Sequence, residues 1–177
     1  MNTSVLRIGF GLLLVVSLAA CASPVDTPVD SSSFEPHNVV ITDYNIPDDG
    51  AGLAGISSAV VLGTFEKTLG QRPAKAVGMG LEGNVDVWQV RVTTAYKGNT
   101  GAVVHVMRWP DNVEAGQYHM TAGVVAVLFL AGPVSGLYTT VCGDSGLLFL
   151  GDGGKTLTTP GALVPGLETI DQVASLF

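Results

Sequence analysis

The sequence predicts an all-β domain that ends in a short helix, and three observations support this class. Residues 85–96 place Trp88 and the apolar residues after it at every second position, which is typical of a strand between a core and solvent. Residues 124–130 are apolar without interruption, as expected for a strand buried on both faces. Glycine-rich turn signals at residues 143–146 and 152–154 separate further short apolar segments.

Taken in chain order, the apolar periodicity and the turn signals predict each element of the domain. Residues 39–41 fit a short edge strand, the Asp-Asp-Gly at residues 48–50 is a turn signal, and residues 52–58 fit one helical turn. The strands of the domain are then expected at residues 57–66, 85–96, 102–109, 124–130, 137–142, 147–150 and 155–158. Residues 168–176 carry apolar side chains at helical spacing, so that the domain is expected to end in a short helix.

The N-terminus predicts export. Residues 1–20 combine one positive charge, a short apolar run and small residues at the end, which are the parts of a secretory signal. The run is shorter than the about 20 apolar residues that span a membrane. The Leu-Ala-Ala-Cys motif at residues 18–21 resembles the lipobox of bacterial lipoproteins. That resemblance implies cleavage before Cys21, a diacylglyceryl thioether on its sulfur and a further acyl chain on its amino group. An ordinary secretory signal is the alternative.

Cleavage before Cys21 divides the chain into three parts. Residues 1–20 are the signal peptide, residues 21–38 are the lipidated cysteine and a flexible Pro- and Ser-rich tether, and residues 39–177 are the β-barrel domain. We expect the domain to be anchored to the bacterial cell membrane or envelope and to face outside the cytoplasm, because two or more acyl chains make anchoring stable. The sequence leaves open which membrane leaflet holds the anchor.

Charge limits the partners of this domain. Removing residues 1–20 from the 177 leaves 157 residues and takes away one basic residue, so that the net charge of −7 becomes −8. This balance argues against nucleic acid, whose binding depends on Lys and Arg that neutralise phosphates, and against a polybasic membrane contact. Within residues 67–84, which we expect to form a loop, Lys67, Arg72 and Lys75 form a locally basic segment. This loop is a possible interaction surface, and a solvated hairpin loop is the alternative.

Cysteine usage adds one further constraint. The chain has two cysteines, Cys21 and Cys142, and an acylated Cys21 cannot form a disulfide with Cys142. Cys142 is therefore expected either to be a buried thiol or to pair between chains.

The order of the expected strands resembles that of netrin/tissue-inhibitor-of-metalloproteinase-like domains. The resemblance covers roughly residues 56–150. It rests on the segments at residues 59–64, 88–98, 127–130 and 138–143. It implies a five-stranded OB-type (Greek-key) barrel, a closed sheet without edge strands, to which the extra hairpin strands and the C-terminal helix are added.

Two departures from that family stand out. Its members are commonly disulfide-bonded, whereas this domain has only Cys142 to offer. Its inhibitory mechanism uses a free N-terminal cysteine to chelate zinc. Acylation of Cys21, and the tether that follows it, would exclude that mechanism here.

Two motifs raise the possibility of catalysis or cofactor binding. Gly-Met-Gly-Leu-Glu-Gly at residues 78–83 matches G-x-G-x-x-G, but a strand follows it where a nucleotide site needs a helix. Gly-Asp-Ser-Gly at residues 143–146 resembles the nucleophile loop of trypsin-like serine proteases, which would use Ser145 with His105 or His119 as base. The histidines lack that family's sequence setting and 157 residues are too few for its two barrels, so that a tight turn is the preferred interpretation.

The sequence as a whole favours a binding module over an enzyme. His37, His105 and His119 lack the i, i+2 or i, i+4 spacing of a metal site, so that we expect no metal, no cofactor and no catalytic residue. The expected function is that of a non-catalytic, lipid-anchored module that binds another protein or an envelope component, with its oligomeric state open. Two alternatives remain, a serine-dependent hydrolase that uses Ser145 and a protease inhibitor whose surface chelates no zinc.

Overall fold

The computed structural model describes residues 37–40, 46–77, 81–108, 120–151, 153–160 and 162–177. The chain divides into two units, Met1–Ser32 and Ser33–Phe177, and all described residues belong to the second. The expected signal peptide, Cys21, the expected tether up to residue 36 and His119 lie outside the described residues. Within the described ranges, no helix is both long and apolar enough to cross a membrane.

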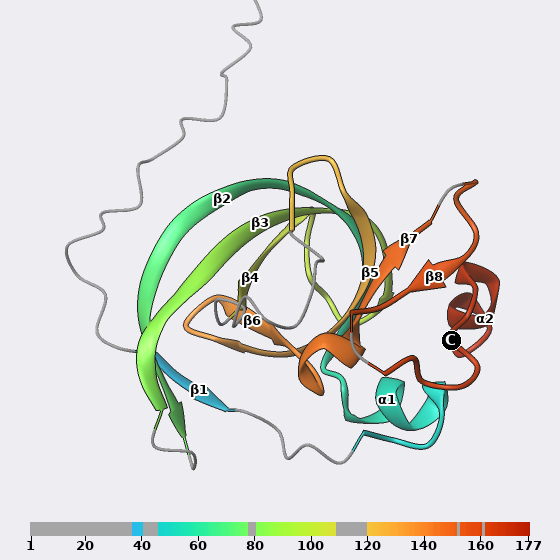
Figure 1. Ribbon diagram of the computed structural model, residues 1–177, viewed down its shortest axis with the longest axis horizontal. Helices are drawn as coiled ribbons and strands as arrows, with labels where there is room; N and C mark the ends of the chain where they lie inside the picture. The colour runs from blue at the N-terminus through green and yellow to red at the C-terminus, as the bar shows by residue number, and fades with distance from the viewer. Residues whose placement is uncertain (1–36, 41–45, 78–80, 109–119, 152, 161) are drawn as a thin grey trace, which may run out of the picture. The chain divides into compact units, whose positions relative to one another are not determined.

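Strands dominate the described residues (Figure 1). In chain order the elements are β1 (His37–Val40), α1 (Gly50–Ile56), β2 (Ala59–Val77), β3 (Leu81–Lys97), β4 (Val103–Arg108), β5 (Val125–Val134), β6 (Leu137–Thr140), η1 (Gly143–Gly146), β7 (Leu147–Leu150), β8 (Leu157–Thr158) and α2 (Ile170–Ala174). The strands join in the order β1-β2-β3-β4-β6-β5-β7-β8, and β2 also pairs with β5. The predicted all-β class with a short C-terminal helix is confirmed.

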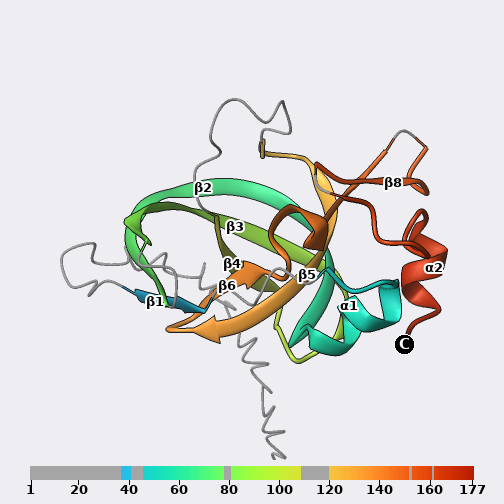
Figure 2. The ribbon, with the colours of Figure 1, turned by 60° about the horizontal axis from the view of Figure 1, so that its bottom comes forward.

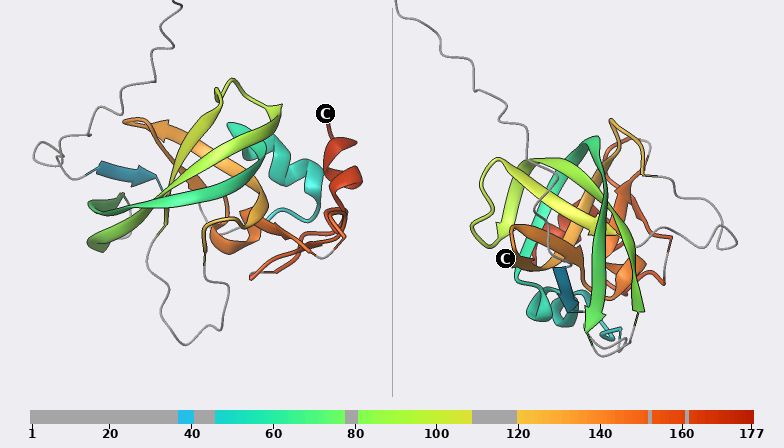
Figure 3. Two further views of the ribbon diagram at one scale, coloured as in Figure 1. Left: turned by 90° about the horizontal axis from the view of Figure 1, so that it is seen from above. Right: turned by 90° about the vertical axis from the view of Figure 1, so that its left-hand side faces the viewer.

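Five of these strands close on themselves. β2, β3 and β4 are consecutive antiparallel neighbours, and β5 returns to lie antiparallel to β2, which is the Greek-key order. β6 completes the ring, because it pairs antiparallel with β5 and parallel with β4. Figure 3 shows the arrangement of these strands from two further directions. The five-stranded OB-type order expected from the resemblance is therefore present as the closed ring β2-β3-β4-β6-β5.

The interior of the ring holds one apolar cluster. Phe65 and Leu128 are fully buried in it, and Trp88 packs against it with its ring edge-on to Phe65 at a centroid separation of 5.8 Å. Val90 and Val92 point to the same interior, so that the period of two predicted from Trp88 onward is confirmed as far as Val92. A register shift follows Val92, and Tyr96 packs against the second cluster instead. Each large side chain buried in this way contributes roughly 1.5–3 kcal/mol.

A second apolar cluster lies on the outside of the ring, under α1 and α2. Val127 and Phe129 of β5 point into this cluster, whereas Leu128 between them points into the ring. β5 is therefore buried on both faces, as its unbroken apolar run predicts. Leu53 of α1 and Val173 near α2's end complete the outer cluster.

Both helices begin at side-chain caps. The Asp49 carboxylate accepts a hydrogen bond of 2.7 Å from the Gly52 amide, which satisfies a free donor at the start of α1. Thr169 and Gln172 form a reciprocal capping box at the start of α2. The observed helices fall within two residues of the starts expected at residues 52 and 168, because such caps fix where a helix can begin.

The segment at residues 67–84 corrects a prediction. We expected a loop there, but β2 runs on to Val77 and β3 begins at Leu81, so that most of the segment is a long hairpin (Figure 2). Lys67, Arg72 and Lys75 consequently lie in a strand. Two of the four register shifts of β2 against β3 fall here, between Phe65 and Lys67 and between Thr68 and Gln71, and backbone pairing continues past them. We call residues 66–91 the arm.

Candidate functional site

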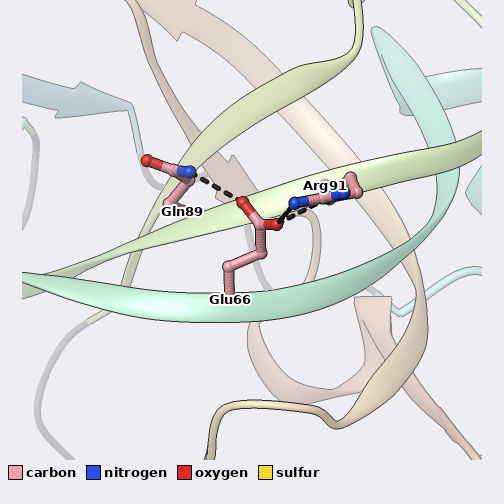
Figure 4. A network of polar contacts seen from close by, with 3 residues as sticks. All are labelled: Glu66, Gln89 and Arg91. Atoms are coloured by element: carbon pink, nitrogen blue, oxygen red, sulfur yellow. Dashed lines mark hydrogen bonds and ion pairs between the residues drawn. The ribbon is translucent and has the colours of Figure 1, made fainter. Parts of the chain in front are cut away.

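A network of polar contacts around Glu66 lies on the arm (Figure 4). The register shift after Phe65 brings Glu66 beside Gln89 and Arg91 of β3. Gln89 Nε2 donates to Glu66 Oε2 at 2.7 Å, and Arg91 Nε donates to Glu66 Oε1 at 2.5 Å. Arg91 Nη2 forms an ion pair with the same carboxylate oxygen. The network therefore links the two strands of the arm on its outer face, opposite the ring interior that holds Phe65 and Val90.

The same contacts keep the Glu66 carboxylate charged. The hydrogen bond from Gln89 is the largest cause that lowers the pKa of Glu66, followed by the hydrogen bond from Arg91. The positive charges of Arg91 and Lys67 lower this pKa further. The Glu66 side chain is 21% exposed and that of Arg91 is 70% exposed, so that the guanidinium is held in place yet open to solvent. A charged side chain that is already held in one position can bind a partner without the entropy cost of first being ordered.

The three predicted basic residues lie at different levels of the arm. Lys67 is exposed and close enough to Glu66 to affect its pKa, so that it borders the network. Arg72 is half-buried, and its Nη1 donates to the Gln71 carbonyl at 3.0 Å. The backbone of Lys75 pairs with that of Glu82. The structure thus joins Lys67 to Glu66 and Arg91, whereas Arg72 and Lys75 lie farther along β2 towards the tip.

Charge is distributed unevenly along the chain. The arm carries four of the eight basic residues, Lys67, Arg72, Lys75 and Arg91, but only three of the fifteen acidic ones, Glu66, Glu82 and Asp86. Its formal charge is therefore +1, and the remainder of the −7 chain carries −8. The arm is a locally basic part of an acidic protein.

The Gly-Asp-Ser-Gly motif forms η1, and local contacts account for the presence of these residues. Ser145 is 3% exposed, and among the described residues no hydrogen bond joins its hydroxyl to an imidazole. The Asp144 carboxylate accepts a 2.7 Å hydrogen bond from Arg108 Nη2, and the Asp144 carbonyl accepts one of 2.6 Å from the Thr159 hydroxyl. A Cβ on Gly146 would lie 2.2 Å from the Val141 carbonyl oxygen, which only glycine avoids.

The other candidate residues of the sequence analysis lie on separate parts of the fold. Cys142 is a buried thiol in the outer apolar cluster, and burial raises its pKa. His105 lies half-buried on β4, in register with Gln89 of β3. His37 begins β1. In the part of the chain that the structure describes, no three potential ligands gather into a metal site.

No protein-family model matches this chain, and no curated protein matches its sequence. The functional argument therefore rests on the chain's own residues. The alternation predicted from Trp88 leaves Gln89 and Arg91 together on the opposite face of their strand, but the sequence analysis missed Glu66 as their partner. Glu66 ends the predicted strand at residues 57–66, and only the register of β2 against β3 shows that it meets Arg91.

Proposed function

We propose that this protein is a lipid-anchored envelope lipoprotein whose domain is a non-catalytic binding module, with the outer face of the arm as its contact surface. The lipobox motif at residues 18–21 and the tether after it support the anchoring. The observation that carries the binding role is the Glu66 network, which holds the exposed guanidinium of Arg91 beside exposed Lys67. Arginine is enriched at protein interfaces and at the few positions that dominate binding energy.

The non-catalytic part of the proposal is supported by the surroundings of η1. A nucleophilic serine needs a base within hydrogen-bond reach and access to substrate. Ser145 is buried, and the neighbouring Asp144 carboxylate is bonded to Arg108. His105 is three residues from Arg108 on β4, and the described residues include no hydrogen bond between it and Ser145.

Two measurements test the proposal. Mass spectrometry of the mature N-terminal peptide should find acylated Cys21, and Cys21→Ser should release the protein from the membrane fraction. The released form should bind isolated envelopes saturably, and Arg91→Ala should weaken that binding about tenfold. Lys155→Ala is the matched control, because Lys155 is exposed and lies outside the arm. An unmodified Cys21, or binding to which Arg91 contributes no more than Lys155, would contradict the proposal.

A further inference from the structure

We propose that the partner of the surface around Arg91 is a protein that presents a carboxylate beside an apolar side chain, with the carboxylate on Arg91 and the apolar side chain on Val103. The inference rests on the proposed function, because it names the class of partner that this surface binds. Three features of the described residues support it: the way in which Glu66 holds Arg91, the side chain that lies next to Arg91 on β4, and the distribution of charge.

Glu66 holds the Arg91 guanidinium by one edge and leaves the other edge open (Figure 4). Nε of Arg91 donates to Oε1 of Glu66 at 2.5 Å, and Nη2 forms an ion pair with the same oxygen. The second edge of the planar group consists of Nη1 and the remaining N–H of Nη2, and the Arg91 side chain is 70% exposed. Two parallel N–H groups on such an edge match the two oxygens of a carboxylate. Arg91 can therefore bind a second carboxylate, supplied by a partner, while it keeps its contact with Glu66.

An exposed apolar side chain lies next to Arg91 on the same face of the sheet. Val103 of β4 is paired with Arg91 of β3, and paired residues of neighbouring strands hold their Cβ atoms about 4.5–5.5 Å apart on one face. The next residue, Val104, points into the ring, so that Val103 points outward, where it is 41% exposed. Among the described residues, it is the one large exposed apolar side chain that lies on a strand. A partner that covers Val103 with an apolar side chain gains free energy from the area that becomes buried beside Arg91.

The row of residues next to this pair is polar. Lys67 of β2 is paired with Gln89 of β3, and Gln89 is paired with His105 of β4, so that the row crosses three strands on the outer face. Lys67 is exposed, whereas Gln89 and His105 are half-buried. Lys67 therefore adds a second exposed cation near Arg91, which favours an acidic group of the partner at this position over a basic one.

The distribution of charge favours a protein partner over an anionic membrane surface or a nucleic acid. Glu66, Lys67 and Arg91 together carry +1, whereas the chain outside the arm carries −8. An extended anionic surface meets other parts of the protein as well, within a Debye length of about 8–10 Å, so that the −8 opposes its approach. A carboxylate on a protein meets the surface around Arg91 alone. A headgroup layer also supplies no apolar side chain that could cover Val103.

Binding of the released Cys21→Ser protein to isolated envelopes tests the two contacts on this protein's side. Arg91→Lys keeps the positive charge but replaces the planar fork by a single ammonium group, so that binding should weaken about fivefold, nearly as much as for Arg91→Ala. Val103→Thr keeps the shape of the side chain and adds a hydroxyl, so that binding should weaken about threefold. Lys155→Ala, the control outside the arm, should leave binding unchanged.

Treatment of the envelopes tests the chemistry of the partner. Digestion of the envelope proteins with protease should abolish the part of the binding that depends on Arg91. Conversion of their carboxylates to methylamides, with a carbodiimide and methylamine, should have the same effect. Vesicles of phosphatidylglycerol and phosphatidylcholine should bind the released protein no more tightly than vesicles of phosphatidylcholine alone.

The possible results separate this inference from the proposed function. If Arg91→Ala weakens binding whereas Arg91→Lys or Val103→Thr does not, the pairing of a carboxylate with an apolar side chain is wrong and the contact surface stands. If Arg91-dependent binding survives the protease, or if the phosphatidylglycerol vesicles reproduce it, the partner is not a protein and the inference is wrong. If Arg91→Ala weakens binding no more than Lys155→Ala does, the proposed function and the inference fail together.

Discussion

Replacement of Gly146 by alanine tests the structural account of the Gly-Asp-Ser-Gly motif most sharply. The added Cβ would lie 2.2 Å from the Val141 carbonyl oxygen, 3.1 Å from the Val141 nitrogen and 3.2 Å from the Phe129 carbonyl oxygen. All three atoms belong to backbone, so that no side-chain rotation relieves the overlap. Overpacking in a well-packed interior costs about 1–3 kcal/mol. We place Gly146→Ala at the upper end, about 3 kcal/mol, because the backbone at Val141 and at Phe129 of β5 would have to move.

Gly143→Ala is the matched control in the same short helix. Gly143 has a φ of +58°, and a Cβ there would meet nothing within 4 Å, so that only the left-handed backbone conformation opposes alanine. That conformation costs about 1–2 kcal/mol. Urea unfolding followed by circular dichroism measures the free energy of unfolding of both variants. This free energy should fall more for Gly146→Ala than for Gly143→Ala. A Gly146→Ala protein as stable as the wild type, or more stable than Gly143→Ala, would refute the packing argument.

Three further predictions follow from the contacts of Glu66, Asp144 and Ser145. The pKa of Glu66 is lower folded than unfolded, so that its stabilising contribution is present above the unfolded pKa and is lost as the pH falls through the folded pKa. Glu66→Gln should flatten the acid limb of the pH–stability curve, and an unchanged limb would contradict this. Asp144→Ala should lower the free energy of unfolding by about 2 kcal/mol, because Arg108, 13% exposed, loses a charged hydrogen bond. Urea titration measures this loss, and a change below about 0.5 kcal/mol would show that the pair is unimportant. A fluorophosphonate probe should not label the native protein, and stoichiometric labelling that Ser145→Ala abolishes would favour the hydrolase alternative.

Much of the strand pattern could be predicted from the sequence, because burial imposes visible periods on it. The alternation from Trp88 reflects a strand with one face in the ring, and the apolar run of β5 reflects a strand between two apolar clusters. The helix starts expected at residues 52 and 168 lie within two residues of those observed, and the caps Asp49 and Thr169, which the sequence analysis did not use, account for the observed starts.

The arm could not be predicted in the same way. Its second strand begins in a Gly-rich segment, and register shifts around Lys67 and Gln71 hide the period of two that a strand usually shows. The partner of Arg91 was equally hidden, because long-range register depends on how the ring closes and not on local spacing. The preferred interpretation of the Gly-Asp-Ser-Gly motif as a tight turn agrees with η1, whose Gly146 has no room for a side chain.

The most direct test of the central claim is photo-crosslinking in intact cells. A diazirine side chain at Thr93 lies on the exposed side of β3, two residues beyond Arg91, and one at Lys155 serves as the control position. We predict a discrete adduct, with protein or lipid, from Thr93 that Arg91→Ala diminishes, and no such adduct from Lys155. Equal crosslinking from both positions, or an adduct from Thr93 that is insensitive to Arg91→Ala, would contradict the assignment of the surface around Arg91 as the contact surface.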